Sequence, residues 1–184
     1  MDTLILTERL RIRRLELSDA EAMFGYRSDP LVTRFQSWEP GAVGELREFI
    51  SGLSEIDVDT PGRWYQLGLF VRESGEMAGD CGIHVQAHDP RQVEIGITLA
   101  RAFQGRGLAT EALRALLGYL FTTLGKHRVY GSVDPRNAPS LALLERVGMR
   151  REAHFVESLW FREAWADDVI FAMLRREYEL RKGA

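Results

Sequence analysis

The sequence predicts one α+β domain over residues 1–184, built on a mixed, mostly antiparallel central sheet of about seven strands flanked by about four helices. Short runs of alternating apolar and polar residues predict the strands, and several runs follow one another directly, as in antiparallel hairpins. A strand–helix–strand unit over residues 91–132 predicts a parallel crossover. The chain has no internal repeat and no linker-like stretch, so we expect a single domain.

The N-terminal part predicts one strand and two helices. Residues 4–16 alternate apolar and polar positions, which indicates a strand with one solvated face. Ser18 followed by Glu21 predicts a capping box at the start of a helix, and Asp29–Pro30 ends that helix. Residues 40–55 predict a second helix, weakened by its glycines.

The remaining elements carry clear periodic patterns. Three strands are predicted in succession, at residues 63–73, 75–86 and 91–100. The clearest helix covers residues 108–124, where apolar residues recur at spacings of three and four. A strand at 127–134 precedes a short helix with Asn137 as N-cap and Gly148 just past its end. The rest of the chain indicates two strands and a polar tail.

Composition excludes several classes of protein. The net charge of −3 argues against nucleic acid as the main partner, because phosphate binding needs a basic surface. Cys81 is the only cysteine and the four histidines show no ligand spacing, so we expect no disulfide framework and no metal. No stretch approaches the roughly 20 apolar residues of a membrane span. We therefore expect a soluble cytoplasmic protein without a membrane partner; a homodimer is compatible with the sequence, which does not fix the oligomeric state.

The stretch QGRGLATEA, residues 104–112, predicts an anion site. A glycine-rich turn before a helix offers free backbone N–H groups and the positive end of the helix dipole, which attract phosphate. A plain flexible strand-to-helix turn is the alternative. A P-loop would need Lys-Ser/Thr after the second glycine, which is missing. A dinucleotide fingerprint would need glycine at Thr110, although Asp134 could serve as the ribose-binding acid.

A third phosphate-binding motif fits better. Gln104, Gly107 and Ala109, followed by the TEA ending of residues 110–112, resemble the Q/R-x-x-G-x-G/A acetyl-CoA motif of the GNAT acetyltransferase superfamily. Residues 137–149, NAPSLALLERVGM, resemble a second motif of that family, N-x-x-S-x-x-L-x-E-K-x-G-F.

The resemblance extends over essentially the whole chain. Arg146 and Met149 are mild departures from the lysine and phenylalanine of the second motif, while Trp165 and Asp168 match a C-terminal strand motif. The resemblance is closest to the branch of RimJ/RimL-type ribosomal-protein N-terminal acetyltransferases. It implies the GNAT fold, with acetyl-CoA as cosubstrate and a sheet splayed where the cofactor enters.

The family resemblance also implies a cofactor site. The pyrophosphate of acetyl-CoA is expected on the backbone N–H groups of residues 104–109. The pantetheine arm is expected along the end of the 91–101 strand, paired with the backbone around Leu99 to Arg101, and Asn137 is expected to face the cofactor. Asn137 could instead be only an N-cap. The residues expected to contact acetyl-CoA are Leu99, Ala100, Arg101, Gln104, Gly105, Arg106, Gly107, Leu108, Ala109, Thr110, Asn137 and Ser140.

Two residues are candidates for catalysis. Ser140 matches the motif serine placed near the cofactor sulfur and is the candidate acid for the leaving thiolate; first-turn capping is the alternative. Glu94 is the candidate base, because it shares a strand face with Gly96 and Thr98, opposite Ile95. An ordinary solvated carboxylate is the alternative. Cys81 as an acetyl-accepting nucleophile is disfavoured, since no nearby motif supplies an activating base.

The acceptor side is less defined. Glu55, within the acidic run at 54–60, could attract a cationic amine, although such runs are commonly just solvated. Phe35, Trp38 and Trp64 could line the acceptor cleft or belong to the core. These are the four residues we expect on the acceptor.

The implied reaction is transfer of an acetyl group from acetyl-CoA to a primary amine by direct attack in a ternary complex. Deprotonating a lysine amine near neutral pH costs about 4 kcal/mol, whereas a protein α-amino group costs roughly half a kcal/mol. A protein N-terminus is therefore the first candidate acceptor, and a small-molecule amine such as a polyamine or an aminoglycoside the second. A non-catalytic acyl-CoA-binding module on the same scaffold is the alternative of another class.

Overall fold

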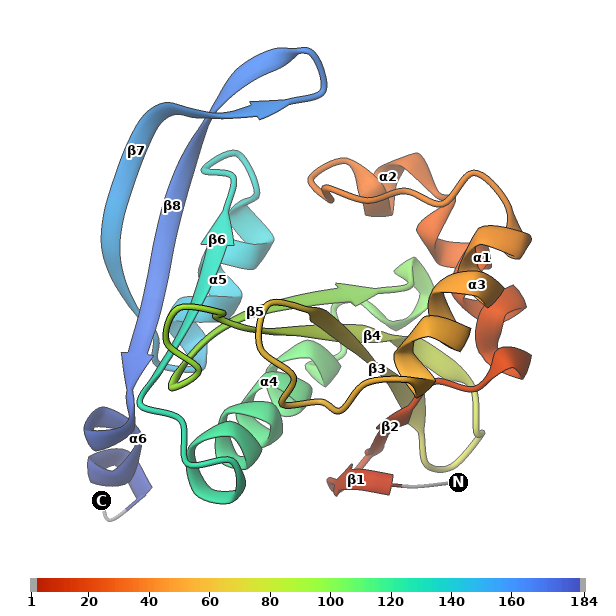
Figure 1. Cartoon of the computed structure of the whole chain (residues 1–184), viewed down its shortest axis with the longest axis horizontal. Coiled ribbons are helices and arrows are strands. Elements are labelled where there is room, and N and C mark those ends of the chain that lie inside the picture. Colours follow the sequence, from red (N-terminus) through yellow and green to blue (C-terminus); the bar gives the residue numbers. More distant parts are fainter. Residues whose placement is uncertain (1–2, 183–184) are drawn as a thin grey trace.

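The computed structural model describes residues 3–182. Within that range, eight strands form one open sheet in the order β1-β2-β3-β4-β5-β6-β8-β7 (Figure 1). Neighbours pair antiparallel except β5 and β6, which pair parallel. The strands are β1 Thr3–Leu6, β2 Leu10–Arg14, β3 Trp64–Val71, β4 Met77–Val85, β5 Gln92–Leu99, β6 Arg128–Val133, β7 Arg150–Phe161 and β8 Ala164–Leu174. The α-helices are α1 Ala20–Arg27, α2 Pro30–Thr33, α3 Val43–Ser54, α4 Leu108–Gly118, α5 Ala138–Arg146 and α6 Arg175–Lys182.

The predicted fold class is confirmed, with one strand and two helices more than expected among the described residues. The extra strand arises because the predicted strand at 4–16 folds back at residues 7–9 into the β1–β2 hairpin. The extra helices are α2, a single turn capped by the Asp29 carboxylate, and α6, which the polar tail forms. The other predicted helices and strands are present with similar bounds.

The predicted capping box of Ser18 and Glu21 is wrong. Ser18 lies inside a 3-10 turn, Leu17–Asp19, and α1 begins after this turn. The Asp19 carboxylate accepts the backbone N–H of Glu16 at 2.8 Å and two bonds from the buried Arg13 guanidinium at 2.7 and 2.9 Å. The carboxylate of Asp19, held by a buried ion pair, therefore caps this turn, because it accepts more hydrogen bonds than a serine hydroxyl can.

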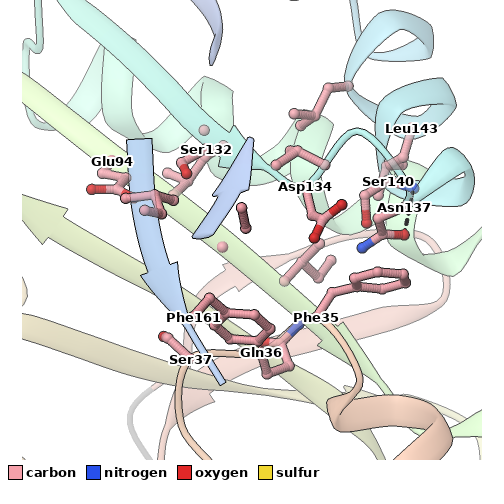
Figure 2. A pocket seen from close by; sticks show the side chains of 18 of the residues that line it. Phe35, Gln36, Ser37, Glu94, Ser132, Asp134, Asn137, Ser140, Leu143 and Phe161 are labelled. Atoms are coloured by element: carbon pink, nitrogen blue, oxygen red, sulfur yellow. Dashed lines mark hydrogen bonds between the residues drawn. The ribbon is translucent and has the colours of Figure 1, made fainter. Parts of the chain in front are cut away.

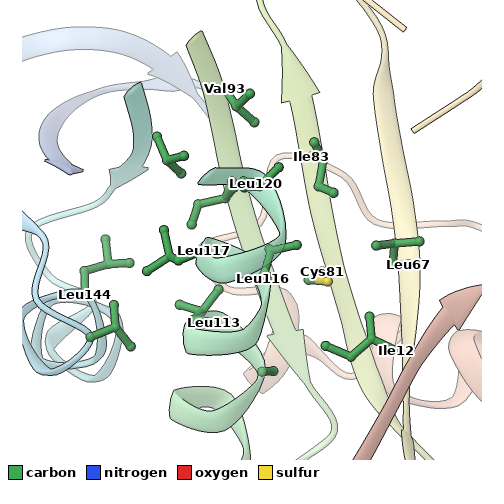
Figure 3. Close-up of a cluster of buried hydrophobic side chains, with 14 of the residues drawn as sticks. Ile12, Leu67, Cys81, Ile83, Val93, Leu113, Leu116, Leu117, Leu120 and Leu144 are labelled. Atoms are coloured by element: carbon green, nitrogen blue, oxygen red, sulfur yellow. The ribbon is translucent and has the colours of Figure 1, made fainter. Parts of the chain in front are cut away.

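One face of the sheet packs on α4, and this interface is the main core (Figure 3). The predicted stripe of α4 continues through a π-helical turn, Tyr119–Thr123, and places Leu113, Leu116, Leu117 and Leu120 against the strands. Their strand partners in this cluster include Ile12, Leu67, Cys81, Ile83 and Val93. The alternating pattern of β3–β5 thus turns every second side chain toward α4.

The other face of these strands is covered by α1 and α3 over part of its area (Figure 1). A second apolar cluster there joins Met23 of α1 and Leu46 of α3 to Phe70 of β3. Beside it, the buried Arg27 guanidinium pairs with Asp80 of β4 through bonds of 2.5 and 3.0 Å. This face therefore mixes apolar packing with a buried ion pair.

The parallel strands β5 and β6 diverge soon after they meet. They are paired only from Gln92↔Arg128 to Glu94↔Tyr130, so the remainder of β5 has no strand partner on that side. This divergence is the predicted splay, and it opens the sheet next to Glu94. Among the helices described, none is both long and apolar enough to cross a lipid bilayer.

Candidate active site

The glycine turn forms the start of α4 as predicted. Gly107 is the N-cap with a left-handed φ of 78°, and Gly105 has a φ of 73°. The first backbone bond of the helix runs from Glu111 N to Gly107 O at 3.1 Å, so the N–H groups of Leu108, Ala109 and Thr110 have no acceptor within the helix. A glycine N-cap has no side chain to cover them. The turn therefore leaves donors and the helix dipole available to an anion.

Side chains brace this turn from both sides. The Gln104 amide donates to the Leu99 carbonyl at 2.9 Å, which ties the turn to the end of β5. Ala100 N donates to Ala78 O, and Arg101 lies 3.7 Å from Asp29. Of the residues expected to contact acetyl-CoA, those from Leu99 to Thr110 thus form one connected segment at the end of β5 and the start of α4.

Glu111 of the TEA motif holds this segment together with Thr7 and Arg9, two residues that no motif in the sequence pointed to. Glu111 accepts from the Thr7 hydroxyl at 2.6 Å and from the Arg9 backbone and side chain at 2.8 and 2.6 Å. The Arg9 guanidinium also donates to the Arg106 carbonyl at 2.8 Å. The β1–β2 hairpin therefore fixes the glycine turn. The only sequence signal for this contact was an acidic residue, Glu111, in the first turn of a helix. Its partners lie about 100 residues away in the chain, so the sequence did not identify them.

The strand gap leads into a pocket of about 240 Å³ (Figure 2). Its walls come from β5, from β6 and the start of α5, from the segment after α2, and from the β7–β8 hairpin. Glu94 and Ser140 lie on opposite sides of the pocket in Figure 2, with Asp134 between them. The structure thus brings both predicted catalytic residues to one cavity.

Glu94 occupies the apex of the strand gap. Ile95 beside it is buried in the α4 core, so the Glu94 side chain points to the opposite face, as expected from the strand alternation. Partial burial is the main cause that raises the pKa of Glu94 above its ordinary value. The Tyr130 hydroxyl, 3.4 Å away, opposes this rise, and the charge of Asp168 adds to it. A carboxylate with a raised pKa in a cavity is suited to accept a proton.

The start of α5 carries the other predicted pair. The Asn137 side chain caps the helix by accepting from Ser140 N at 3.3 Å, so the capping alternative holds, and Asn137 also lines the pocket. Ser140 lies in the first turn of α5, and its side chain borders the same pocket. Capping and a ligand contact are therefore compatible at Asn137.

The four residues expected on the acceptor fall into two groups. Phe35 and Trp64 line the pocket, and the Trp64 ring stacks on His84 with centroids 5.1 Å apart. Trp38 does not line the pocket, since it packs on Phe49 at 4.9 Å in the second apolar cluster. Glu55 is exposed at the end of α3, outside the pocket. The structure thus supports a cleft position for the first two alone.

Cys81 is buried in the α4 core (Figure 3), and burial raises the pKa of its thiol. A buried thiol of raised pKa is a poor nucleophile. The core position agrees with the choice of direct attack over an acetyl-cysteine intermediate.

The charged side chains that line the pocket are all acidic. Asp134 and Asp167 line it together with Glu94, and none of the described lining residues is basic. Bonds from Arg136 hold the pKa of Asp134 below its ordinary value, and the Glu157 backbone N–H does the same for Asp167. Both stay ionised at neutral pH. Their place in the pocket with Glu94 was not predicted from the sequence, because it depends on contacts between segments far apart in the chain.

The comparisons with known proteins agree with this geometry. Residues 9–150 match the model of an acetyltransferase (GNAT) domain. An uncharacterized N-acetyltransferase p20 of Bacillus licheniformis is 33% identical over 97% of this chain and 99% of its own. The ribosomal protein uS5-alanine N-acetyltransferase of Escherichia coli is 27% identical over 92% of this chain and 89% of its own. A crystal structure of a GNAT acetyltransferase from Bacillus anthracis superimposes with a TM-score of 0.85 at 27% identity, covering 94% of this chain and 99% of that one.

The family match covers most of the chain, from the β1–β2 turn to the start of β7, and so includes the glycine turn, the strand gap and α5. The relatives match over nearly their whole lengths. The chain therefore belongs to the GNAT acetyltransferase family, in a RimJ/RimL-like branch, and is an N-acetyltransferase.

Proposed function

We propose that this N-acetyltransferase moves the acetyl group of acetyl-CoA to the α-amino group of a protein N-terminus. The observation that carries the proposal is the strand gap: the unpaired part of β5 runs from Glu94 in the pocket to Leu99, whose carbonyl accepts a hydrogen bond from Gln104 of the glycine turn. One end of this path suits a pyrophosphate, and the other suits a positively charged amine. A relative named as a ribosomal protein uS5-alanine N-acetyltransferase also supports a protein acceptor.

The glycine turn fits the diphosphate of acetyl-CoA on steric grounds. A Cβ added to Gly105 would meet no atom within 4 Å, so the space over the turn is open. We assign the diphosphate to the N–H groups of residues 105–110 and the pantetheine to the unpaired side of β5. Arg146, which lies 3.4 Å from the Thr110 hydroxyl, is placed to add a positive charge there.

In the pocket, Glu94 removes a proton from the ammonium form of the acceptor, directly or through water. The free amine then attacks the thioester carbonyl, and the C–S bond breaks. The proton that the attacking nitrogen loses passes through the Ser140 hydroxyl to the departing sulfur, which leaves a neutral amide and the CoA thiol. An α-amino group needs little help from the base, because its pKa lies only about one unit or less above neutral pH. Alignment of the two substrates then supplies most of the rate enhancement.

A small-molecule amine is the second candidate acceptor, and the acidic lining favours it. Arg136 offsets the charge of Asp134, so Glu94 and Asp167 are the two lining carboxylates that no arginine or lysine among the described residues pairs with, one more than a single ammonium group requires. A polyamine would use that surplus, with a second ammonium group on Asp167.

An acceptor screen tests the proposal. We expect CoA release with peptides that carry a free N-terminus and none with the same peptides blocked at the N-terminus but retaining a lysine. Mass spectrometry then places the acetyl group on the α-amine. Activity with spermidine or an aminoglycoside alone would favour the second candidate, and CoA release that no amine accelerates would contradict acetyl transfer.

A pair of glycine variants tests the cofactor site. Gly107→Asp adds a carboxylate where we place the diphosphate, so the dissociation constant for acetyl-CoA should rise well over tenfold, a loss of at least about 1.4 kcal/mol. Gly75→Asp is the matched control, because Gly75 has a similar φ of 75°, open space around it, and a place in the β3–β4 turn. Equal acetyl-CoA affinity in the two variants, measured by calorimetry, would refute the assignment.

A further inference from the structure

A second pocket, of about 260 Å³, adjoins the first and has the opposite charge. Three arginines line it, namely Arg34, Arg136 and Arg162, and no acidic side chain is among its described lining residues. The two pockets share Phe35, Phe161 and Ala166 as common walls. A ligand in the acidic pocket can therefore extend past these shared residues onto a basic surface.

Two of the arginines are already engaged. The Arg136 guanidinium donates hydrogen bonds of 2.5 to 3.2 Å to the Asp134 carboxylate. Arg162 donates to Glu39 at 3.0 Å and to the Thr33 carbonyl at 3.1 Å. Arg34 differs from both. It is exposed, its guanidinium lies 5.1 Å from the centre of the Phe35 ring, and it makes no hydrogen bond or salt bridge within residues 3–182. Arg34 thus presents a full set of donors to this pocket.

Contacts between separate segments of the chain hold these arginines in place. Arg162 and Glu163 form the tip of the β7–β8 hairpin with left-handed φ angles of 48° and 64°, which non-glycine residues adopt at a cost. The contacts of Arg162 with Thr33 and Glu39 attach this tip to the segment around α2. The hairpin and the α2 segment therefore keep Arg34 and Arg162 on one pocket.

We infer that the second pocket binds a carboxylate of the acceptor, so that the preferred acceptor is a peptide N-terminus with acidic side chains among the residues that follow it. The inference rests on the proposed function. The α-amine enters the acidic pocket toward Glu94, and the acidic side chain pairs with the Arg34 guanidinium. Arginine suits this role because its planar donors match a carboxylate, and charge-assisted bonds of this kind are about twice as strong as neutral ones.

Three matched peptides test this inference. Each begins with alanine, differs only in residues two to four, which are Asp, Asn or Lys, and ends in an amide so that no terminal carboxylate interferes. We expect kcat/KM to be about tenfold higher for the Asp peptide than for the Asn peptide, as one good charge-assisted bond provides, and lowest for the Lys peptide.

Variants of Arg34 assign the preference to this pocket. In Arg34→Gln the ratio of kcat/KM for the Asp and Asn peptides should fall close to one, and in Arg34→Glu it should fall below one. Arg176→Gln is the control, because Arg176 is exposed on α6 and lines neither pocket, so this variant should keep the wild-type ratio. Melting temperatures show whether each variant is folded.

Three results would overturn the inference in distinguishable ways. Equal kcat/KM for the three peptides would refute it while the proposed function stands. Acetylation of spermidine but of no peptide would refute the proposed function and the inference with it. An Arg34→Gln enzyme that keeps the peptide ratio but has a raised KM for acetyl-CoA would assign this arginine to the cofactor.

Discussion

The two faces of strands β3–β5 have different roles, although alternate residues of the same strands form both. The face toward α4 carries Leu67, Cys81 and Val93 and is apolar throughout this cluster. The face toward α1 and α3 carries buried Asp80 and half-buried Glu94, with Gly82 and Gly96 on the same face. Because successive side chains alternate, three strands provide both a rigid core and a chemical surface.

Glycine makes this division possible. Gly82 and Gly96 are paired across β4 and β5, next to the His84↔Glu94 pair. A Cβ at Gly82 would come within 2.4 Å of the Gln66 side chain, while one at Gly96 would meet open space. The polar face is therefore open over Gly96, next to Glu94, and filled over Gly82, whereas the α4 face is filled throughout its apolar cluster. Substitutions on the two faces should separate activity from stability.

Glu94→Gln should give the largest effect, on activity alone. Because an α-amino group needs little help from a base, we expect kcat to fall by about 10²-fold, the low end of the range for loss of a general base. Burial raises the pKa of Glu94 above its ordinary 4.5, so wild-type activity should fall as pH drops through that raised pKa, and this acid limb should vanish in the variant. A raised carboxyl pKa means that the folded state disfavours the ionised form, so the melting temperature at neutral pH should not decrease. Glu48→Gln, on the exposed side of α3, is the control, and an unchanged pH profile in Glu94→Gln would contradict the role.

Asp80→Ala should show that the polar face also contains structural residues. Asp80 is buried and accepts from Tyr26 at 2.6 Å, from Arg27, and from Gln66 at 3.1 Å. Its removal leaves the Arg27 charge buried and unpaired, which lowers the free energy of unfolding by about 3–5 kcal/mol. Urea denaturation measures this loss. The double variant Asp80→Ala/Arg27→Met should recover most of it, and a single-variant loss below about 1 kcal/mol would mean that water replaces the carboxylate.

Leu116→Ala should give a smaller loss of stability and no loss of chemistry. Leu116 is fully buried between α4 and the strands, so its truncation leaves a cavity that lowers the free energy of unfolding by about 2–5 kcal/mol. We expect kcat of the folded enzyme to stay at its wild-type value under stabilising conditions. A large fall in kcat with intact stability would show that the α4 face is not separate from the site.

The elements that were correctly predicted from the sequence are those that depend on short-range patterns. The α4 stripe, the alternation of β5 and the α5 caps at Asn137 and Gly148 each depend on neighbours within one or two turns, and the structure confirms these elements. The β1–β2 turn was missed because residues 7–9 lack glycine, asparagine and proline, the usual turn signals. α6 was missed because its sequence has no apolar stripe of its own.

The candidate site was only partly predictable for the same physical reason. Motif spacing identified Ser140 and the glycine turn, and alternation identified the side of β5 on which Glu94 lies. The tie between Arg9 and Glu111, the position of Asp167 in the pocket and the unpaired Arg34 all depend on contacts between segments far apart in the chain. No periodic or composition signal in one sequence encodes such contacts.

The short pairing of β5 and β6 also leaves part of a strand without its ladder. The strands pair at the usual separation of about 4.8 Å as far as Glu94↔Tyr130, and the rest of β5 lacks a partner strand on that side. An extended guest with amide groups can therefore lie along this edge of β5 and continue the backbone pairing as an added strand would.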